Sequence, residues 1–231
     1  MNVFVGTSGW SYGWNKGGTL DWYLRKSGLN AVELNASFYR FPYKNQVAGW
    51  AGKGTELRWC IKVHRFVTHQ YKFNDTARRI WENFLDLFRP LDPLIDYYLF
   101  QAPPLMKNSD RILRFFDGLP LLDKCVLEIR NRSLILDDTA CRKLQEFLPL
   151  VSVDSPDARN RIFSGHLVYM RMHGRDDWYQ YDYSQEELEE TAAMIQKTGA
   201  ENAYLFFNNN HSMLENAQRM RELFRSGRSV T

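Results

Sequence analysis

Apolar residues recur along the chain in short runs, and most runs are followed by a turn and then by a segment with helical spacing. The runs are rich in Val, Ile, Leu, Phe and Tyr, and their shortness favours strands over helices. They lie at residues 3–7, 31–35, 58–64, 97–101, 125–130, 150–154, 167–173 and 203–208. The pattern therefore predicts eight strands.

Segments with helical spacing lie between these strands. Residues 75–88 place Ile80, Phe84 and Leu87 on one helical face, and residues 184–199 begin with a capping-box sequence and end at a glycine. Other helices are predicted at residues 19–28, 109–119, 137–148 and 213–224. Residues 155–165 are too short and too polar for a full helix.

Strands that alternate with helices are typical of an α/β protein with a parallel sheet. Eight such units indicate a (β/α)8 TIM barrel, slightly reduced by a short or missing helix after the sixth strand. A doubly wound open sheet is the alternative. The sequence has no linker, composition break or low-complexity stretch, so we expect a single domain over residues 1–231.

Apolar and polar residues alternate in the predicted strand at 167–173. Arg171 and His173 share a face with Tyr169, whereas Met170 and Met172 take the other face. The outward face of a barrel strand packs on helices and is apolar. Arg171 and His173 should therefore point into the barrel.

Polar residues also occur at the carboxyl ends of the other predicted strands. In a barrel, these ends form the catalytic face. The polar residues at these ends are Glu33, Asn35, Lys62, His64, Gln101, Glu128, Arg130, Asp154 and Asn208. The charged members could instead neutralise one another in a buried network. Desolvating an ion costs on the order of several kcal/mol, however, and apolar residues often stabilise a core equally well. The pattern therefore predicts a functional site.

Eight motifs occur in order along the chain: GTSGWSY, VELNASFYRFP, KVHRFVTH, FQAPP, LEIRNRS, VDSP, YMRMHG and FFNNN. Together they resemble the YecE-like family of TIM-barrel proteins, catalogued as domain of unknown function 72. The resemblance implies the barrel fold but no defined activity. The positions that match are Glu33, Asn35, Lys62, Thr68, His69, Gln101, Glu128, Arg130, Asp154, Arg171, His173 and Asn208.

Cations from three strands should converge on one mouth, where arginine binds phosphate or carboxylate through two hydrogen bonds. Carboxylates and a histidine beside them can transfer protons. These features predict a lyase, isomerase or hydrolase for a small phosphorylated or carboxylated, sugar-like substrate. The predicted catalytic residues are Glu33, Glu128, His173 and Asp154. The predicted substrate-binding residues are Asn35, Lys62, His69, Gln101, Arg130, Arg171 and Asn208.

Two other reactions use similar residues. Glu128, Asp154, His173 and His69 are ligand types for a divalent metal, as in a metal-dependent phosphodiester hydrolase. Such a metal is possible, but the neighbouring arginines would repel it. We therefore assign no metal ligands and predict no definite cofactor. Glu33 and Glu128 could also act as the carboxylate pair of a glycoside hydrolase.

A non-catalytic binding module is a further alternative. Aromatic residues crowd the first two strand–helix loops, at residues 10–14 and 38–43, and recur at 178–183. Aromatic side chains interleaved with Lys and Arg can stack on bases and follow phosphates, which would make the partner a single-stranded nucleic acid. The same rings could simply cover the end of the barrel.

Composition adds little to these alternatives. The chain has 231 residues, is 44% hydrophobic and 25% charged, and has a formal net charge of +3, which neither requires nor excludes nucleic acid. Cys60, Cys125 and Cys141 form no paired motif, which argues against a disulfide framework and a thiolate zinc site. No signal-peptide or membrane-span pattern is present, so we expect a cytoplasmic protein without a membrane partner.

Overall fold

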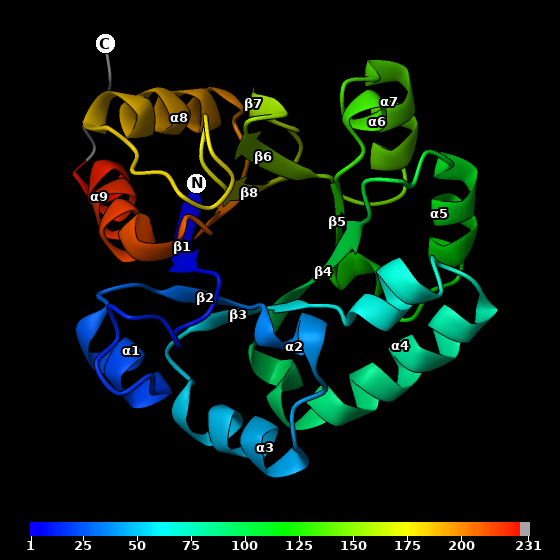
Figure 1. The fold of residues 1–231 in the computed structure, drawn as a ribbon, viewed down its shortest axis with the longest axis horizontal. Helices are drawn as coiled ribbons and strands as arrows, with labels where there is room; N and C mark the ends of the chain where they lie inside the picture. The colour runs from blue at the N-terminus through cyan, green and yellow to red at the C-terminus, as the bar shows by residue number, and fades with distance from the viewer. Residues whose placement is uncertain (227–231) are drawn as a thin grey trace. The chain divides into compact units, whose positions relative to one another are not determined.

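The protein is described by a computed structural model of residues 1–226, and residues 227–231 of the predicted domain lie outside the described residues. The chain divides into two compact units, which are drawn in Figure 1. Unit 1 comprises residues 1–33, 56–58 and 151–231, and unit 2 comprises residues 34–55 and 59–150.

Unit 1 contains six strands in the order β2-β1-β9-β8-β6-β7. Neighbouring strands are parallel, except that β7 pairs with β6 in the antiparallel sense. Their bounds are β1 (Asn2–Thr7), β2 (Ala31–Leu34), β6 (Val151–Ser155), β7 (Ala158–Arg161), β8 (Leu167–Met172) and β9 (Asn202–Phe207). The last residue of β2 belongs to unit 2.

The helices of unit 1 pack on one another and on these strands. They are α1 (Leu20–Lys26), α8 (Gln185–Lys197), the short 3-10 helix η4 (Asn210–Ser212) and α9 (Met213–Arg225). Helix α9 packs against β1, β9 and α8. The apolar positions of α9 give it one buried face, which includes Ala217 and Met220.

Unit 2 contains three parallel strands in the order β3-β4-β5. Their bounds are β3 (Arg58–Lys62), β4 (Ile95–Ala102) and β5 (Cys125–Ile129). One further parallel bridge joins Leu127 in β5 to Leu150. The first residue of β3 belongs to unit 1.

The helices of unit 2 surround an aromatic core. The α-helices are α2 (Ala36–Tyr39), α3 (Lys44–Lys53), α4 (Asp75–Phe88), α5 (Ser109–Phe116), α6 (Arg132–Ile135) and α7 (Asp138–Gln145). The other helices are the π-helix η1 (Phe66–Gln70) and the 3-10 helices η2 (Arg89–Leu94) and η3 (Leu122–Lys124). Trp81 of α4 contacts Tyr98 and Phe100 of β4, with both pairs of ring centroids 5.0 Å apart, and all three rings are buried.

The eight predicted strands are all present, within one or two residues of their predicted ends. The protein is therefore a mixed α/β protein whose strands are mostly parallel, as predicted. Residues 156–166 contain no helix, also as predicted, but they contain the unpredicted strand β7. Sequence patterns missed β7 because its residues, Ala-Arg-Asn-Arg, are mostly polar and none is a strong strand former.

Three α-helices of unit 2 were not predicted, and neither were η1, η2 and η3. Helices α2 and α6 are single turns of four residues, too short to show a helical period. Helix α3 buries only Val47, so its apolar residues do not form a stripe. Within residues 1–226, no helix is long and apolar enough to cross a membrane, and Cys60, Cys125 and Cys141 are all buried.

Candidate functional site

The predicted site residues do lie at or just beyond the carboxyl ends of their strands, and most of them are buried. Gln101 and Glu128 are the penultimate residues of β4 and β5, and Lys62 is the last residue of β3. Arg171 and Asp154 are penultimate in β8 and β6. Parallel strands thus bring these groups to one edge within each unit.

Glu128 is the centre of a buried polar group in unit 2. Its Oε1 atom pairs with Nε of Arg130 at 2.6 Å, and its Oε2 atom accepts a hydrogen bond from Nε2 of Gln101 at 2.9 Å. Glu128 is fully buried, whereas Arg130 is partly exposed. The carboxylate therefore holds two side chains that sequence analysis placed in the site, and Arg130 keeps a route to solvent.

Lys62 lies in the same unit beside an aromatic ring. Its ammonium nitrogen is 4.2 Å from the centroid of the Phe38 ring, and the side chain is buried. The Phe38 ring also meets the edge of His69, with centroids 5.0 Å apart. The Nδ1 atom of His69 lies 2.8 Å from the hydroxyl of Thr68, which fixes the orientation of the imidazole.

His69 lies in a strongly positive field. Burial lowers the pKa of its imidazole, and the positive charges of Lys62, Arg130 and Arg65 lower it further, to about 4, against a smaller opposite effect of Glu128. The imidazole is consequently neutral near pH 7. A neutral, partly exposed imidazole surrounded by cations is suited to hydrogen-bond to an anion.

The His69 pKa predicts how stability depends on pH. A folded-state pKa lowered from 6.5 to about 4 means that the unfolded chain binds the proton more tightly, so stability falls as the pH drops through this window. Urea unfolding at several pH values should show a smaller loss for His69→Asn than for the unchanged protein. The pKa of His64 is also lowered, but His64 is present in both proteins. The difference between their two profiles of unfolding free energy against pH therefore reports on His69 alone. Identical pH profiles would contradict the assignment.

Unit 1 contains a second buried carboxylate, Glu33 on β2. Its Oε1 atom accepts hydrogen bonds from Nη2 and Nε of Arg171, at 2.7 and 3.1 Å, and its Oε2 atom accepts one from the Tyr169 hydroxyl at 2.7 Å. Both members of the ion pair are completely buried. The alternation in β8 correctly predicted that Tyr169 and Arg171 share a face. The pair joins β2 to β8 inside unit 1.

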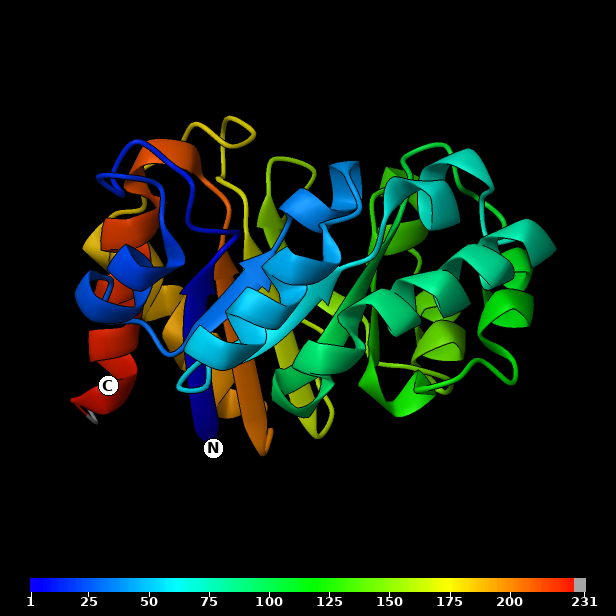
Figure 2. The same ribbon diagram turned by 90° about the horizontal axis from the view of Figure 1, so that it is seen from below.

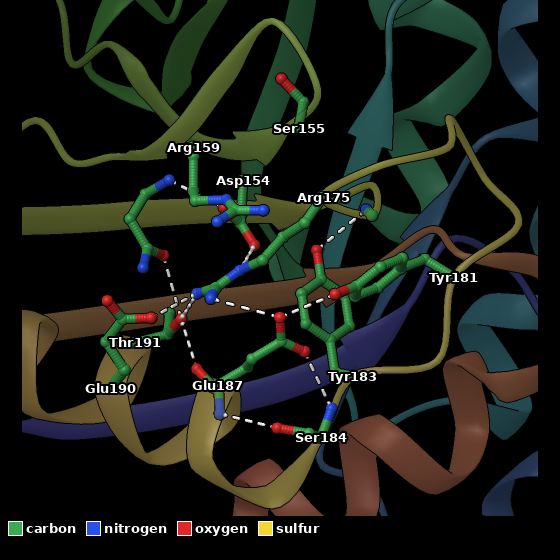
Figure 3. A network of polar contacts seen from close by, with 12 residues as sticks. Asp154, Ser155, Arg159, Arg175, Tyr181, Tyr183, Ser184, Glu187, Glu190 and Thr191 are labelled. Carbon is green, nitrogen blue, oxygen red and sulfur yellow. Dashed lines mark hydrogen bonds and ion pairs between the residues drawn. The ribbon is translucent and has the colours of Figure 1, made fainter.

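Asp154 is bound to an arginine that sequence analysis did not select, Arg175 (Figure 3). Its Oδ2 atom pairs with Nε of Arg175 at 2.9 Å, and its Oδ1 atom accepts the backbone N–H of Asn160 at 2.7 Å. Asp154 is fully buried and the Arg175 side chain is 5% exposed. Asp154 therefore ties the end of β6 to β7 and to the segment that follows β8.

The other nitrogens of Arg175 bind helix α8. Nη2 pairs with Glu190 at 2.8 Å, and Nη1 lies 3.3 Å from Glu187, which also accepts the Tyr181 hydroxyl at 2.7 Å (Figure 3). Burial alone would lower the pKa of Arg175, but its hydrogen bonds and charge interactions with Asp154 and Glu190 outweigh burial and raise it. Arg175 thus stays charged and connects β6 with α8.

Gly174 begins the loop between β8 and α8, and its backbone needs a glycine. Its φ is +105°, and a Cβ atom there would lie 2.4 Å from the carbonyl oxygen of Asp177 and 2.6 Å from Cβ of Tyr181. The Gly174 N–H donates to the buried Tyr183 hydroxyl at 2.8 Å. The loop at residues 174–183 is therefore held closely against the strand end.

We expect Gly174→Ala to destabilise the protein by about 2–4 kcal/mol, because the new methyl group is both strained and in contact with backbone. Chemical denaturation measures the loss. Gly165→Ala is the matched control, since no atom lies within 4 Å of a Cβ at that position and its φ is not in the left-handed region. Equal effects of the two substitutions would contradict the argument.

His173 lies between the strand ends and this loop. Its Nδ1 atom is 3.4 Å from the amide nitrogen of Asn208, whose Oδ1 atom accepts the Ser8 hydroxyl at 2.7 Å. The rings of Trp178 and Tyr179 lie 5.4 and 5.7 Å from the His173 ring. His173 and Asn208 are thus brought together as predicted, and Ser8 joins them.

The structure therefore gathers the predicted residues into separate sets within the units. Lys62, His69, Gln101, Glu128 and Arg130 belong to unit 2, and the side chain of Asn35 in the same unit is only partly buried. The unit 1 sets are Glu33 with Arg171, Asp154 with Arg175, and His173 with Asn208.

Sequence analysis missed several polar residues of these sets, among them Arg175, Tyr183 and Ser8, and did not predict Tyr169 as a hydrogen-bond donor. Alternation could have pointed to Tyr169. Arg175 follows a glycine with positive φ, beyond which the alternation of a strand no longer holds. Among residues 1–226, no group of three or more His, Cys, Asp or Glu side chains is placed to hold a metal ion.

The fold and these sets define a class of protein: an α/β protein with polar side chains gathered at the carboxyl ends of mostly parallel strands. More specifically, the chain belongs to the family described as protein of unknown function DUF72, whose sequence model matches residues 4–230. A search of curated proteins found no match.

Solved structures of two bacterial DUF72 family proteins are similar to this chain. The protein from Thermotoga maritima MSB8 shares 24% identity and a TM-score of 0.83, over 97% of this chain and 100% of its own. The protein from Enterococcus faecalis V583 shares 22% identity and a TM-score of 0.78, over 97% and 98% of the two chains. At these identities the likeness establishes a shared fold.

Proposed function

We propose that the protein is an enzyme that binds a small anionic, sugar-like substrate, phosphorylated or carboxylated, at the strand ends of unit 2. The observation that carries the proposal is the convergence of Lys62, Arg65 and Arg130 on a neutral His69. Lys62 and Arg130 at the carboxyl ends of β3 and β5, with Arg65 in the loop after β3, favour an anion, and the burial of Lys62 strengthens its interaction with that anion.

Each residue of unit 2 has a role in this proposal. Lys62 and Arg130 bind the anionic group, and the aromatic ring of Phe38 beside Lys62 contacts the sugar-like part. His69, held by Thr68, contacts the bound anion as a neutral imidazole. Glu128 positions Arg130 and Gln101 and shares in the acid–base chemistry.

The polar residues of unit 1 have different proposed roles. Glu33 and Asp154 have both carboxylate oxygens bonded within unit 1, so we assign them to positioning Arg171 and Arg175. His173, whose Nδ1 atom lies 3.4 Å from the amide nitrogen of Asn208, keeps the role of a proton carrier.

We also propose that the eight parallel strands form one (β/α)8 TIM barrel of the YecE-like type, as a single domain. The strand order within each unit supports this, because consecutive parallel strands are neighbours in both. The parallel bridge from Leu127 to Leu150 gives further support, since Leu150 directly precedes β6 and Leu127 lies in β5.

The test is thermal denaturation with inorganic phosphate, a hexose phosphate or a hexuronate, each with and without Mg²⁺, at fixed ionic strength. A ligand at a hundred times its dissociation constant should stabilise the protein by about 2.7 kcal/mol, a shift of a few degrees. Lys62→Ala and Arg130→Ala should abolish the shift. Arg89→Ala is the matched control. Arg89 precedes β4 rather than following a strand, and it forms an exposed ion pair with Asp86.

The outcomes separate the alternatives. Stabilisation by an anion without metal, lost in Arg130→Ala and kept in Arg89→Ala, supports the proposal. Glu128→Gln should then abolish turnover and spare binding. Stabilisation only with metal indicates a metal-dependent hydrolase instead. No shift with any of the anions, or equal losses in both arginine variants, overturns the proposal.

A further inference from the structure

Unit 2 exposes large aromatic side chains on the loops that follow β2 and β3. Four rings there are between 36% and 69% exposed: Tyr39, Tyr43, Phe66 and Tyr71. They come from the end of α2, the start of α3 and the π-helix η1. Helix α2 and the cyan segment at residues 66–70 both lie at the upper edge of Figure 2. Several large rings exposed close together on two neighbouring loops are typical of an interaction surface.

Ring contacts connect these exposed side chains across the two loops. Tyr39 meets the edge of Phe38 at 5.0 Å between centroids, and Phe38 meets His69 at the same distance. On the other side, His64 packs between Phe41 and Phe66, at 4.4 and 4.5 Å. Tyr39 and Phe66 thus each pack on further aromatic rings rather than standing singly, and Tyr71 contacts Phe66 at 6.3 Å between centroids.

The same segments carry positive charge and no negative charge. Residues 36–55 and 59–74 contain no Asp or Glu, and their six basic residues are Arg40, Lys44, Lys53, Lys62, Arg65 and Lys72. Four of these, Arg40, Lys44, Arg65 and Lys72, are exposed and lie next to the exposed rings in sequence. The guanidinium of Arg40 lies 5.9 Å from the centre of the Tyr43 ring. A polyanion is the partner that complements this charge.

The backbone of the second loop is unusual as well. Residues 66–70 form a π-helix, a rare element that is frequent at functional sites. Lys72 and Phe73 follow with φ angles of +47° and +61°, which non-glycine residues seldom adopt. Phe73 is buried against Phe115, at 5.3 Å between centroids. This anchor leaves Tyr71 and Lys72 exposed on the surface.

We propose that this aromatic–basic surface, formed by the rings of Tyr39, Tyr43, Phe66 and Tyr71 and the cations of Arg40, Lys44, Arg65 and Lys72, binds single-stranded nucleic acid. Bases stack on the exposed rings and phosphates meet the cations. A duplex is a poorer partner, because its bases are already stacked on one another. The inference goes beyond the proposed function and does not depend on it.

The test measures fluorescence anisotropy of a labelled oligothymidylate of about 12 nucleotides with the full chain. Tyr39→Ala and Phe66→Ala should each weaken binding by about 5-fold or more, the loss expected for one stacked base. Lys44→Ala should reduce the slope of log affinity against log salt concentration by about 0.7, the value for one phosphate contact on a single strand.

Matched controls lie in the same unit. Phe147 is 46% exposed and is not part of the aromatic–basic surface. Lys53 is the last residue of helix α3 and Lys44 is its first, so the two lysines are roughly 13 Å apart along the helix. Phe147→Ala and Lys53→Ala should change neither affinity nor salt dependence. All these side chains are exposed, so their loss is not expected to unfold the protein.

Several results would overturn this inference: no binding at low salt, unchanged affinity in both ring variants, duplex binding as tight as single-strand binding, or equal effects of the controls. The two proposals fail separately. Tyr39→Ala and Phe66→Ala should leave stabilisation by a hexose phosphate intact, so loss of oligonucleotide binding alone reports on the surface. Absence of stabilisation by every small anion, with oligonucleotide binding retained, reports on the proposed enzyme site.

Discussion

Replacement of Arg171 by methionine is expected to destabilise the protein by about 3–5 kcal/mol, a large fraction of the stability of about 5–15 kcal/mol that is typical of a folded domain. The guanidinium and the Glu33 carboxylate are both completely buried, so removing one partner leaves the other charge without compensation. The Tyr169 hydroxyl, the other hydrogen-bond donor to Glu33, cannot neutralise it. Urea unfolding, followed by circular dichroism, measures the difference.

The double variant Glu33→Leu, Arg171→Met is the informative control. Buried ion pairs can often be replaced by apolar residues with little loss, so the double variant should recover most of the stability. A residual loss of about 1–3 kcal/mol is expected, since the Tyr169 hydroxyl then lacks its acceptor. If the single variant folds as stably as the original protein, Arg171 is not a structural ion-pair partner and its predicted role in substrate binding gains support.

Replacement of Arg175 by methionine is expected to cost about 3 kcal/mol, for a related reason. Asp154 then stays buried without its charged partner, although its Oδ1 atom still accepts the Asn160 N–H. The loop at residues 174–183 should also loosen. Hydrogen exchange at the amides of Gly174 and Tyr179 measures this, because they donate to the Tyr183 hydroxyl and the His173 carbonyl.

Arg159→Met is the matched control for Arg175→Met. Arg159 forms an ion pair with Asp176 at 3.4 Å, and both side chains are more than half exposed. Such pairs contribute about 0–1 kcal/mol. Comparable losses in the two variants, or unchanged amide exchange in Arg175→Met, would contradict the assignment of Arg175 as the residue that organises this loop.

The alternation of apolar and polar residues was sufficient to locate the eight parallel strands and the polar groups at their ends. It succeeded for Arg171 because a residue buried in a strand shares its face with the residue two positions earlier, here Tyr169. It also placed Glu128 and Gln101 correctly at neighbouring strand ends, where they bond to each other.

The same reasoning could not find interactions that depend on loops. Arg175 comes after Gly174, whose positive φ turns the chain out of the strand, so no period relates Arg175 to Arg171. Nor could it find the low pKa of His69, because the cations responsible come from β3, the residue before η1 and the end of β5. Helix α3 escaped detection since it lies on the surface with little apolar periodicity.

Strand β7 has a consequence for how the protein behaves at high concentration. It is the last strand in the order of unit 1, and it pairs with β6 through Val153 with Arg161 and Ser155 with Ala158. Without it, the backbone donors and acceptors at Val153 and Ser155 of β6 would be open to a strand from another molecule. A four-residue strand bearing Arg159 and Arg161 is a poor template for such pairing, and β7 thereby protects the sheet against aggregation.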